Sequence, residues 1–172
     1  LDGNECGVDD SMSWRRTAER CQKYRGKHND ARRTDAGSGP NQHCPPRAIT
    51  ALSNVKGTVT SAINGLEPNG YTVIPAGLLW GWRVLTPSAP FTEGKVFNDK
   101  KRVKAIVLLT DGSNDVGAMS NGHNGSDYNA FGFAAKGHLG STSGSDAVST
   151  LDAKAQTVCN NIKATGILIY TI

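Results

Sequence analysis

One short run of residues constrains the fold of this chain more than any other. Residues 103–110 read VKAIVLLT, and this aliphatic and β-branched run stops abruptly at Asp111-Gly112. Such a run predicts a strand that is buried on both faces, as in a parallel sheet whose two sides are covered by helices. We therefore expect an α/β domain with Asp111 at the carboxyl end of a buried strand.

Three helices are predicted from apolar residues spaced by three, four or seven positions. The first begins at Pro45-Pro46, the second follows Thr72 and ends at Thr86-Pro87, and the third ends at Gly166, a residue type that commonly terminates helices. Their apolar positions are Ile49, Leu52, Val59, Ile63 and Leu66 in the first, Ile74, Leu78, Trp82 and Leu85 in the second, and Val148, Leu151, Ala155, Val158 and Ile162 in the third.

A second apolar strand, ILIYTI, closes the chain at residues 167–172. Strand, long loop, helix and strand in this order predict a right-handed crossover unit of a Rossmann-like open parallel sheet flanked by helices. Two buried strands do not complete such a sheet. We therefore expect residues 44–172 to be a partial domain, whose missing strands come from the same polypeptide or from a partner.

Residues 1–43 have a different character and are predicted to be a loop-rich basic insertion. Between Trp14 and Asp35 the chain carries eight Arg and Lys against three Asp and Glu, although its whole net charge is only +4. No nucleic-acid-binding motif accompanies this basic stretch, so a solvated loop is the simpler interpretation and no specific nucleic-acid partner is expected. No run approaches the roughly 18 apolar residues of a membrane span.

The four cysteines, Cys6, Cys21, Cys44 and Cys159, form no C-x-x-C pair, which argues against a zinc ribbon. They permit two disulfides in three possible pairings, of which Cys6 with Cys21 and Cys44 with Cys159 is the natural one because Cys6 and Cys21 flank the basic stretch. The alternative is four buried thiols in a reducing cytosol. Because the composition is rich in loops, we favour disulfides and an oxidising compartment.

The candidate chemistry lies at the end of the first predicted strand. Ligands of parallel α/β sheets bind beyond the carboxyl ends of the strands, where Asp111 stands. Ser113, Asn114 and Asp115 follow with further oxygen atoms, and Thr72 stands just before a predicted helix. Hard oxygen ligands suit Mg²⁺ or Mn²⁺, and also Ca²⁺, better than zinc. The alternative to cation binding is purely structural: Asp111 and Thr72 would then cap their local turns.

Two stretches of the sequence resemble a known family. Leu-Leu-Thr-Asp-Gly at 108–112, preceded by Gly-x-Thr at 70–72, resembles the von Willebrand factor type A domain. Residues 70–94, GYTVIPAGLLWGWRVLTPSAPFTEG, are similar to TadG-like proteins of Tad/Flp pilus assembly in Gram-negative bacteria, and so is the ending KATGILIYTI at 163–172. The resemblance covers about residues 44–172.

The resemblance implies a metal-ion-dependent adhesion site. In such domains one Thr, one Asp and a D-x-S-x-S loop hold a divalent cation, which an acidic group of the ligand then contacts. Thr72 matches the Thr and Asp111 matches the Asp, with Asp115 as a weaker candidate. Asp9, Ser11 and Ser13 have the letters of the loop, but no buried apolar strand precedes them.

The resemblance implies a non-enzymatic binding or adhesion module in the periplasm or on the cell surface, with a protein or a surface ligand as partner. It also implies that any contact with a membrane is made by a region outside this chain. Two alternatives stay open. One is a Mg²⁺-dependent enzyme that uses Asp111 in hydrolysis or phosphoryl transfer, for which Asp115 is the only close second acid. The other is a structural domain whose metal site has degenerated.

Overall fold

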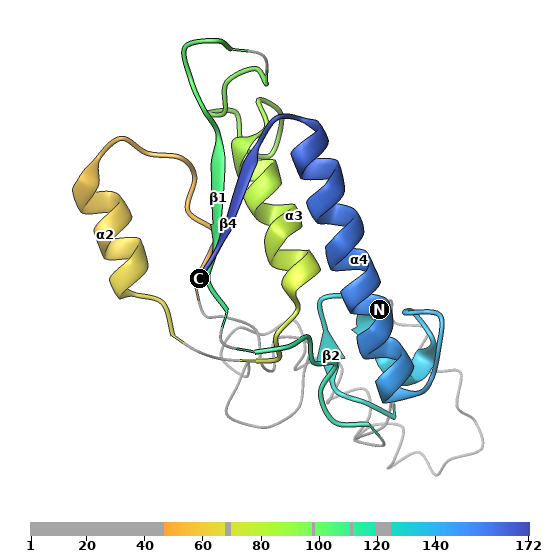
Figure 1. Ribbon diagram of the computed structural model, residues 1–172. Helices are drawn as coiled ribbons and strands as arrows, with labels where there is room; N and C mark the ends of the chain where they lie inside the picture. Colours follow the sequence, from red (N-terminus) through yellow and green to blue (C-terminus); the bar gives the residue numbers. More distant parts are fainter. Residues whose placement is uncertain (1–46, 68–69, 98, 111, 120–124) are drawn as a thin grey trace. The chain divides into compact units, whose positions relative to one another are not determined.

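The computed structural model describes residues 47–67, 70–97, 99–110, 112–119 and 125–172 (Figure 1). The chain divides into two compact units, Leu1–Cys44 and Pro45–Ile172, and all described residues belong to the second. The basic insertion predicted over residues 1–43 therefore lies outside the described residues.

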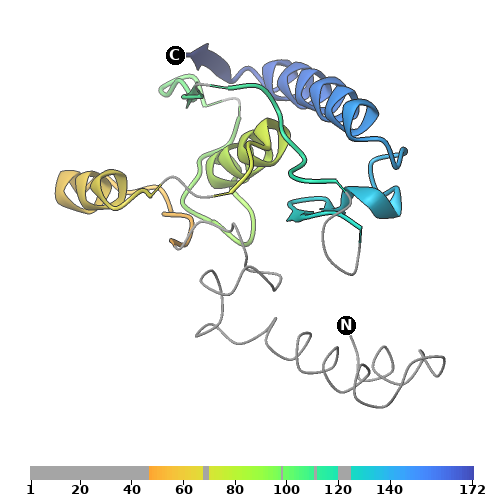
Figure 2. The same cartoon turned by 90° about the horizontal axis from the view of Figure 1, so that it is seen from below.

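The second unit contains both helices and strands, as the sequence predicts for an α/β domain. Strands β1 (Ala105–Leu108) and β4 (Leu168–Thr171) pair in parallel, with Ala105 opposite Leu168 and Leu108 opposite Thr171. Helix α4 (Gly144–Ala164) connects the loop after β1 to β4 (Figure 2). The predicted strand–loop–helix–strand unit with parallel strands is thus confirmed.

Helices α3 (Ile74–Leu85) and α4 pack against each other, α3 against β1 and α4 against β4 (Figure 1). The core of this layer consists of Leu78 from α3, Ile162 from α4 and Ile167, which precedes β4. Ile106, Leu108 and Ile169 of the two strands pack on this core. Both helices occupy the residues predicted for them, and Gly166 ends α4 with a φ of +82°.

The prediction that both strands are buried on both faces is wrong for the described residues. Val107 is 60% exposed and Tyr170 is 55% exposed, whereas their neighbours Ile106 and Ile169 pack on the core. Burial therefore alternates along β1, and Ile169 is the one residue of β4 that is not exposed, because α3 and α4 cover one face and no described element covers the other. The aliphatic run cannot distinguish these cases, since it places apolar side chains on both faces of the strand.

The first predicted helix is only half correct. Helix α2 spans Lys56–Asn64, whereas residues 49–55 are not helical. Within that segment the hydroxyl of Ser53 accepts a hydrogen bond from the backbone N–H of Val55 at 3.1 Å. Such local bonds from Ser, Thr and Asn compete with helical ones, and they delay the start of the helix.

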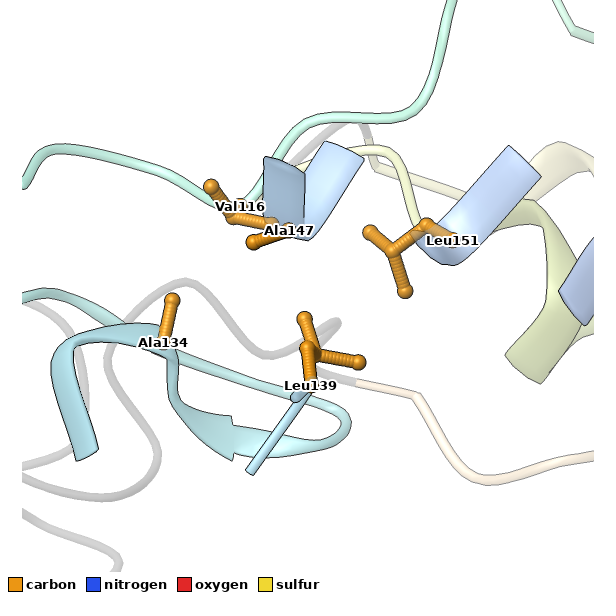
Figure 3. Close-up of a cluster of buried hydrophobic side chains, with 5 residues drawn as sticks. All are labelled: Val116, Ala134, Leu139, Ala147 and Leu151. Carbon is orange, nitrogen blue, oxygen red and sulfur yellow. The ribbon is translucent and has the colours of Figure 1, made fainter. Parts of the chain in front are cut away.

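The stretch predicted as one long loop is partly folded. Two short antiparallel strands, β2 (Tyr128–Asn129) and β3 (Gly132–Phe133), lead into a 3₁₀ turn, η4 (Ala134–Lys136). A second apolar cluster joins this segment to the first half of α4, as Figure 3 shows; its buried members are Val116, Ala134, Leu139, Ala147 and Leu151. Through this cluster, the segment that follows β1 packs against the first half of α4.

Candidate functional site

The candidate site lies at the carboxyl end of β1. The backbone N–H of Thr110 donates to the carbonyl of Ile172 at 3.5 Å, which carries the parallel pairing to the last residue before Asp111. Asp111 itself lies outside the described residues, and the chain is described again from Gly112. The Thr110 hydroxyl oxygen accepts a hydrogen bond from the N–H of Gly112 at 3.3 Å. This contact links the two described residues on either side of Asp111.

Thr72 and the loop after β1 are in direct contact. The backbone N–H of Asp115 donates to the carbonyl oxygen of Thr72 at 2.8 Å. Thr72 is half-buried, and its hydroxyl forms no hydrogen bond with any other described residue. The loop that follows Thr-Asp-Gly therefore contacts the Gly-x-Thr segment, through Asp115 and Thr72.

Asn114 joins this loop to both helices. Its side-chain oxygen accepts a hydrogen bond from the N–H of Ile74 at 2.9 Å, and its side-chain nitrogen donates to the Asp152 carboxylate at 2.7 Å. Ile74 is the first residue of α3, whose N-cap residue, Val73, makes no side-chain cap bond. Asn114 thus satisfies a helix N-terminal N–H, which has no acceptor within the helix, from a distant part of the chain.

This finding corrects one expectation. The sequence suggests Asn114 as an oxygen ligand, but its side chain is 5% exposed and is bonded on both sides within the protein. Ser113 and Asp115, in contrast, are exposed. One oxygen of Asp115 accepts a hydrogen bond from the N–H of Gly117 at 2.8 Å.

Tyr71, the residue before Thr72, makes a second polar contact. The hydroxyl of Tyr71 donates to Oδ2 of Asp127, and the same oxygen accepts the backbone N–H of Ala118 at 3.1 Å. The hydrogen bond to Asp127 raises the pKa of Tyr71, and burial and the negative charge of Asp127 raise it further. All three favour the protonated hydroxyl, so Tyr71 remains a hydrogen-bond donor well into the alkaline range.

Gly117 allows the loop to pass close to the Tyr71 ring. Its φ is +79°, a conformation that residues with a side chain rarely adopt. A Cβ atom at this position would lie 2.5 Å from Cε2 of Tyr71. A residue with a side chain would therefore be strained here, and it would also collide with the ring.

The two segments that meet here carry oxygen-bearing side chains. Their described oxygen donors are the hydroxyls of Thr72 and Ser113 and the carboxylate of Asp115. In the part of the chain that the structure describes, no three or more His, Cys, Asp or Glu side chains are grouped to hold a metal ion. A site of hydroxyls and one or two carboxylates does not require such a group, and it matches the ligands that Mg²⁺ prefers.

Several predicted site residues cannot be placed. Asp9, Ser11, Ser13, Cys6, Cys21 and Cys44 lie outside the described residues, as Asp111 does. Cys159 is half-buried beside the core of α3 and α4, and it forms no disulfide with a described residue. The metal-ligand roles of Asp9, Ser11, Ser13 and Asp111 stay predictions, and so do the disulfide pairings of the cysteines.

Comparisons with protein-family models, curated proteins and solved structures find no match to this chain. The structure adds one negative finding, since none of the helices in its described ranges combines the length and the apolar character needed to cross a membrane.

Sequence reasoning missed the polar residues that bring the site together. Asp152 gives no signal, because it lies on a polar face of α4 and contacts Asn114 across 38 residues. Tyr71 and Asp127 are 56 residues apart and look like ordinary loop residues. The one available signal is that Ile74 begins a helix, since the first N–H groups of a helix have no acceptor within it.

Proposed function

We propose that this protein is a non-enzymatic binding module of the bacterial cell envelope. A divalent cation at the carboxyl end of β1 would bind an acidic group of a partner protein or of a surface ligand. The observation that carries this proposal is the hydrogen bond between Asp115 and Thr72, which brings the Gly-x-Thr segment to the loop that follows Asp111.

Thr72 and Asp111 are the residues that would hold the cation, Mg²⁺ or Mn²⁺, with Ca²⁺ as a third candidate. The Thr72 hydroxyl suits this role because it is fixed by its backbone and has no partner among the described residues. Asp115 and Ser113 are weaker candidates, and Asp9, Ser11 and Ser13 would complete the ligand set if the D-x-S-x-S loop of the resemblance lies there. The bound cation would supply an open coordination position for a carboxylate.

The cellular role follows from the resemblance of residues 44–172 to type A domains of TadG-like proteins. The mixed α/β fold with parallel β1 and β4 is compatible with a type A domain. On this proposal the module contributes to the assembly or attachment of a Tad/Flp-type pilus, in the periplasm or at the cell surface. Its partners are envelope or pilus components.

Thermal unfolding with and without 5 mM Mg²⁺ or Mn²⁺ tests the cation site. A ligand that binds only the native state at about 100 times its Kd stabilises that state by about 2.7 kcal/mol, which is a rise of about 5–10 °C in Tm. We expect this rise in the wild type and its loss in both Thr72→Ala and Asp111→Ala.

Thr58→Ala is the matched control, because it removes the same hydroxyl from an exposed position on α2. Its Tm should rise with Mn²⁺ as much as that of the wild type. If no cation shifts the Tm of the wild type, the proposal is wrong.

A further inference from the structure

We propose that the outer edge of β1 is a docking site for an extended, uncharged segment of a partner protein, which joins the sheet as a further strand. The site consists of the backbone groups along this edge and of an apolar groove that β1 lines together with α3. The inference goes beyond the proposed function, because it needs no bound cation.

The first observation concerns the direction of the backbone groups of β1. The N–H of Ile172 donates to the carbonyl of Leu108 at 3.0 Å. In a parallel pair every second residue of a strand bonds to its neighbour, so the even-numbered residues of β1 face β4. Ala105, Val107 and Leu109 therefore direct their backbone groups to the outer edge. Within the described ranges, no backbone group bonds to them there.

The second observation is a groove of about 520 Å³ beside this edge. One side of α3, with Gly77, Trp80 and Gly81, lines it together with Ala105 and Ile106 of β1, and none of its lining residues is charged. A Cβ atom on Gly77 would meet nothing within 4 Å, and one on Gly81 would lie 3.7 Å from Cδ1 of Ile106. The two glycines thus leave space between the helix and the strand for side chains from another source.

Trp80 forms a fixed wall of this groove. The ring of Phe91 packs edge-to-face on it at 6.5 Å between centroids, and the Arg83 guanidinium lies 4.6 Å from its centroid. The Trp80 side chain is nevertheless 38% exposed. An aromatic side chain that its neighbours already orient loses little conformational freedom on binding, so it is suited to contact a partner.

The edge and the groove together define what fits. A helix satisfies its own N–H and C=O groups, whereas an extended segment needs partners such as the free groups of Ala105, Val107 and Leu109. An added strand would place alternate side chains on the two faces of the sheet. Those on the helical face would enter the groove, and the others would lie beside Val107 and Leu109, which are 60% and 77% exposed.

The charge of the occupant follows from the same surfaces. Neither the lining of the groove nor the row of Ala105, Val107 and Leu109 carries a charge. A charged side chain of the occupant would lose its water there without gaining a partner, which is costly. The occupant is therefore an extended segment of about five uncharged residues, apolar on the side of the groove.

The test is amide hydrogen exchange of the full 172-residue chain, followed by NMR with and without a synthetic peptide. The peptide alternates Val and Thr and carries Lys only at its two ends. In the free protein the N–H groups of Ile106 and Leu108 should be protected, and those of Val107 and Leu109 should exchange freely. With the peptide at about ten times its Kd, exchange at Val107 and Leu109 should slow about tenfold.

A second peptide controls for adsorption on the exposed apolar face. Its two central residues, one Val and one Thr, are replaced by Pro, which removes a backbone donor from each of its edges. It should protect neither Val107 nor Leu109, because protection of these alternate N–H groups requires pairing along the edge.

A first pair of protein variants tests the groove. Gly77→Leu fills it, and leucine favours a helix more than glycine does, so α3 should keep its fold. We expect the Val–Thr peptide to bind this variant about tenfold more weakly, as for the loss of one buried aliphatic side chain. Gly57→Leu is the matched control, because Gly57 lies on α2 and a Cβ atom there also meets nothing within 4 Å. It should bind the peptide as the wild type does.

A second pair of variants tests the edge. Val107→Pro removes an N–H that points away from β4, and it leaves the bonds between the two strands in place. Thr171→Pro is its counterpart on the outer edge of β4, since the neighbouring N–H of Ile172 is the one that donates to β1. Val107→Pro should abolish binding of the peptide, and Thr171→Pro should not change it. Far-ultraviolet circular dichroism establishes that each variant is folded, and Gly77→Leu decides if Val107→Pro is not.

Any other result contradicts the inference. If the peptide leaves exchange at Val107 unchanged, or if Gly77→Leu binds it as tightly as the wild type, the edge of β1 is not a docking site. If Val107 and Leu109 are protected in the protein alone, the occupant is not a partner protein. Protection that increases with protein concentration would then identify a second copy of the chain, and protection independent of concentration would identify a segment of the same chain.

Discussion

The body of the α3–α4–β1–β4 layer and its end near Thr72 are held together by different forces. In the body, Leu78, Ile162 and Ile167 are almost completely buried against one another. At the end, hydrogen bonds of Asn114 and Tyr71 to groups at defined distances and directions join the smaller apolar cluster of Val116 and Leu151. Burial of apolar surface is non-directional, whereas hydrogen bonds depend on geometry.

The difference separates stability from position. Apolar packing supplies most of the free energy of folding, and it tolerates small shifts of the packed elements. A cation site does not tolerate such shifts, because its ligands must approach one point. We therefore expect the polar contacts around Thr72 to contribute little to the total stability and much to the geometry of the proposed site. The following variants test this division, in order of decreasing expected effect.

The largest effect on stability is expected in the body, for Ile162→Ala. The change removes a fully buried side chain and leaves a cavity between α4 and its neighbours, which typically costs 2–5 kcal/mol. We expect a loss of about 3 kcal/mol in the free energy of unfolding, measured by urea denaturation. At a temperature where the variant is folded, its Mn²⁺ affinity should equal that of the wild type.

Ile63→Ala on α2 is the control for this variant, since Ile63 is 60% exposed. Its cost should stay within about 0.5 kcal/mol, as for other surface changes. A folded Ile162→Ala protein that has lost Mn²⁺ binding would contradict the division, because the body would then also determine the position of the ligands.

A smaller effect is expected at the end of the layer, for Gly117→Ala. Alanine pays a conformational penalty of roughly 1–2 kcal/mol at positive φ. Its Cβ would also displace the Tyr71 ring, from which it would lie 2.5 Å away. We expect a loss of about 2–3 kcal/mol in the free energy of unfolding, together with weaker Mn²⁺ binding, because Tyr71 is adjacent to Thr72.

Gly140→Ala is a matched control for the backbone. Gly140 has a φ of +81°, close to that of Gly117, but a Cβ atom there would meet nothing within 4 Å. The difference between the two variants isolates the contact with Tyr71. If both lower stability equally and neither changes Mn²⁺ binding, the Tyr71 ring has no part in the site.

The sequence predicts the apolar body of the layer better than the polar contacts at its end. The parallel strands and the helices α3 and α4 are predicted nearly to their observed ends, because apolar spacing records which face of a helix is buried. The burial of only one sheet face is not predicted, since Val107 and Ile106 are equally apolar. The first helix is predicted too long, because Ile49 and Leu52 have helical spacing whatever conformation Ser53 favours.

The candidate site is predicted only where a motif marks it. Thr72 belongs to the Gly-x-Thr pattern at 70–72. Its contact with the loop after β1 follows from the parallel sheet. Asn114 is different, because its partners Ile74 and Asp152 lie 40 and 38 residues away. An Asn in a Gly-Ser-Asn-Asp stretch reads as a loop residue, since nothing local shows that it is buried.

The smallest effect is expected for Tyr71→Phe, and its signature is a dependence on pH. The pKa of Tyr71 is raised by its bond to Asp127, so the folded state holds the proton more tightly than the unfolded state does. The stability that this bond contributes is fully present below the unfolded pKa of about 10, and it is lost as the pH rises through the raised pKa of the folded state. Tyr71→Phe should therefore cost about 1 kcal/mol at pH 7 and less at pH 11, as measured by urea denaturation at both values.

Tyr170→Phe, at a side chain that is 55% exposed, should show no such difference between the two pH values. A cost of Tyr71→Phe that is the same at pH 7 and pH 11 would show that the Tyr71 hydroxyl contributes through packing, and the end of the layer would then resemble its body.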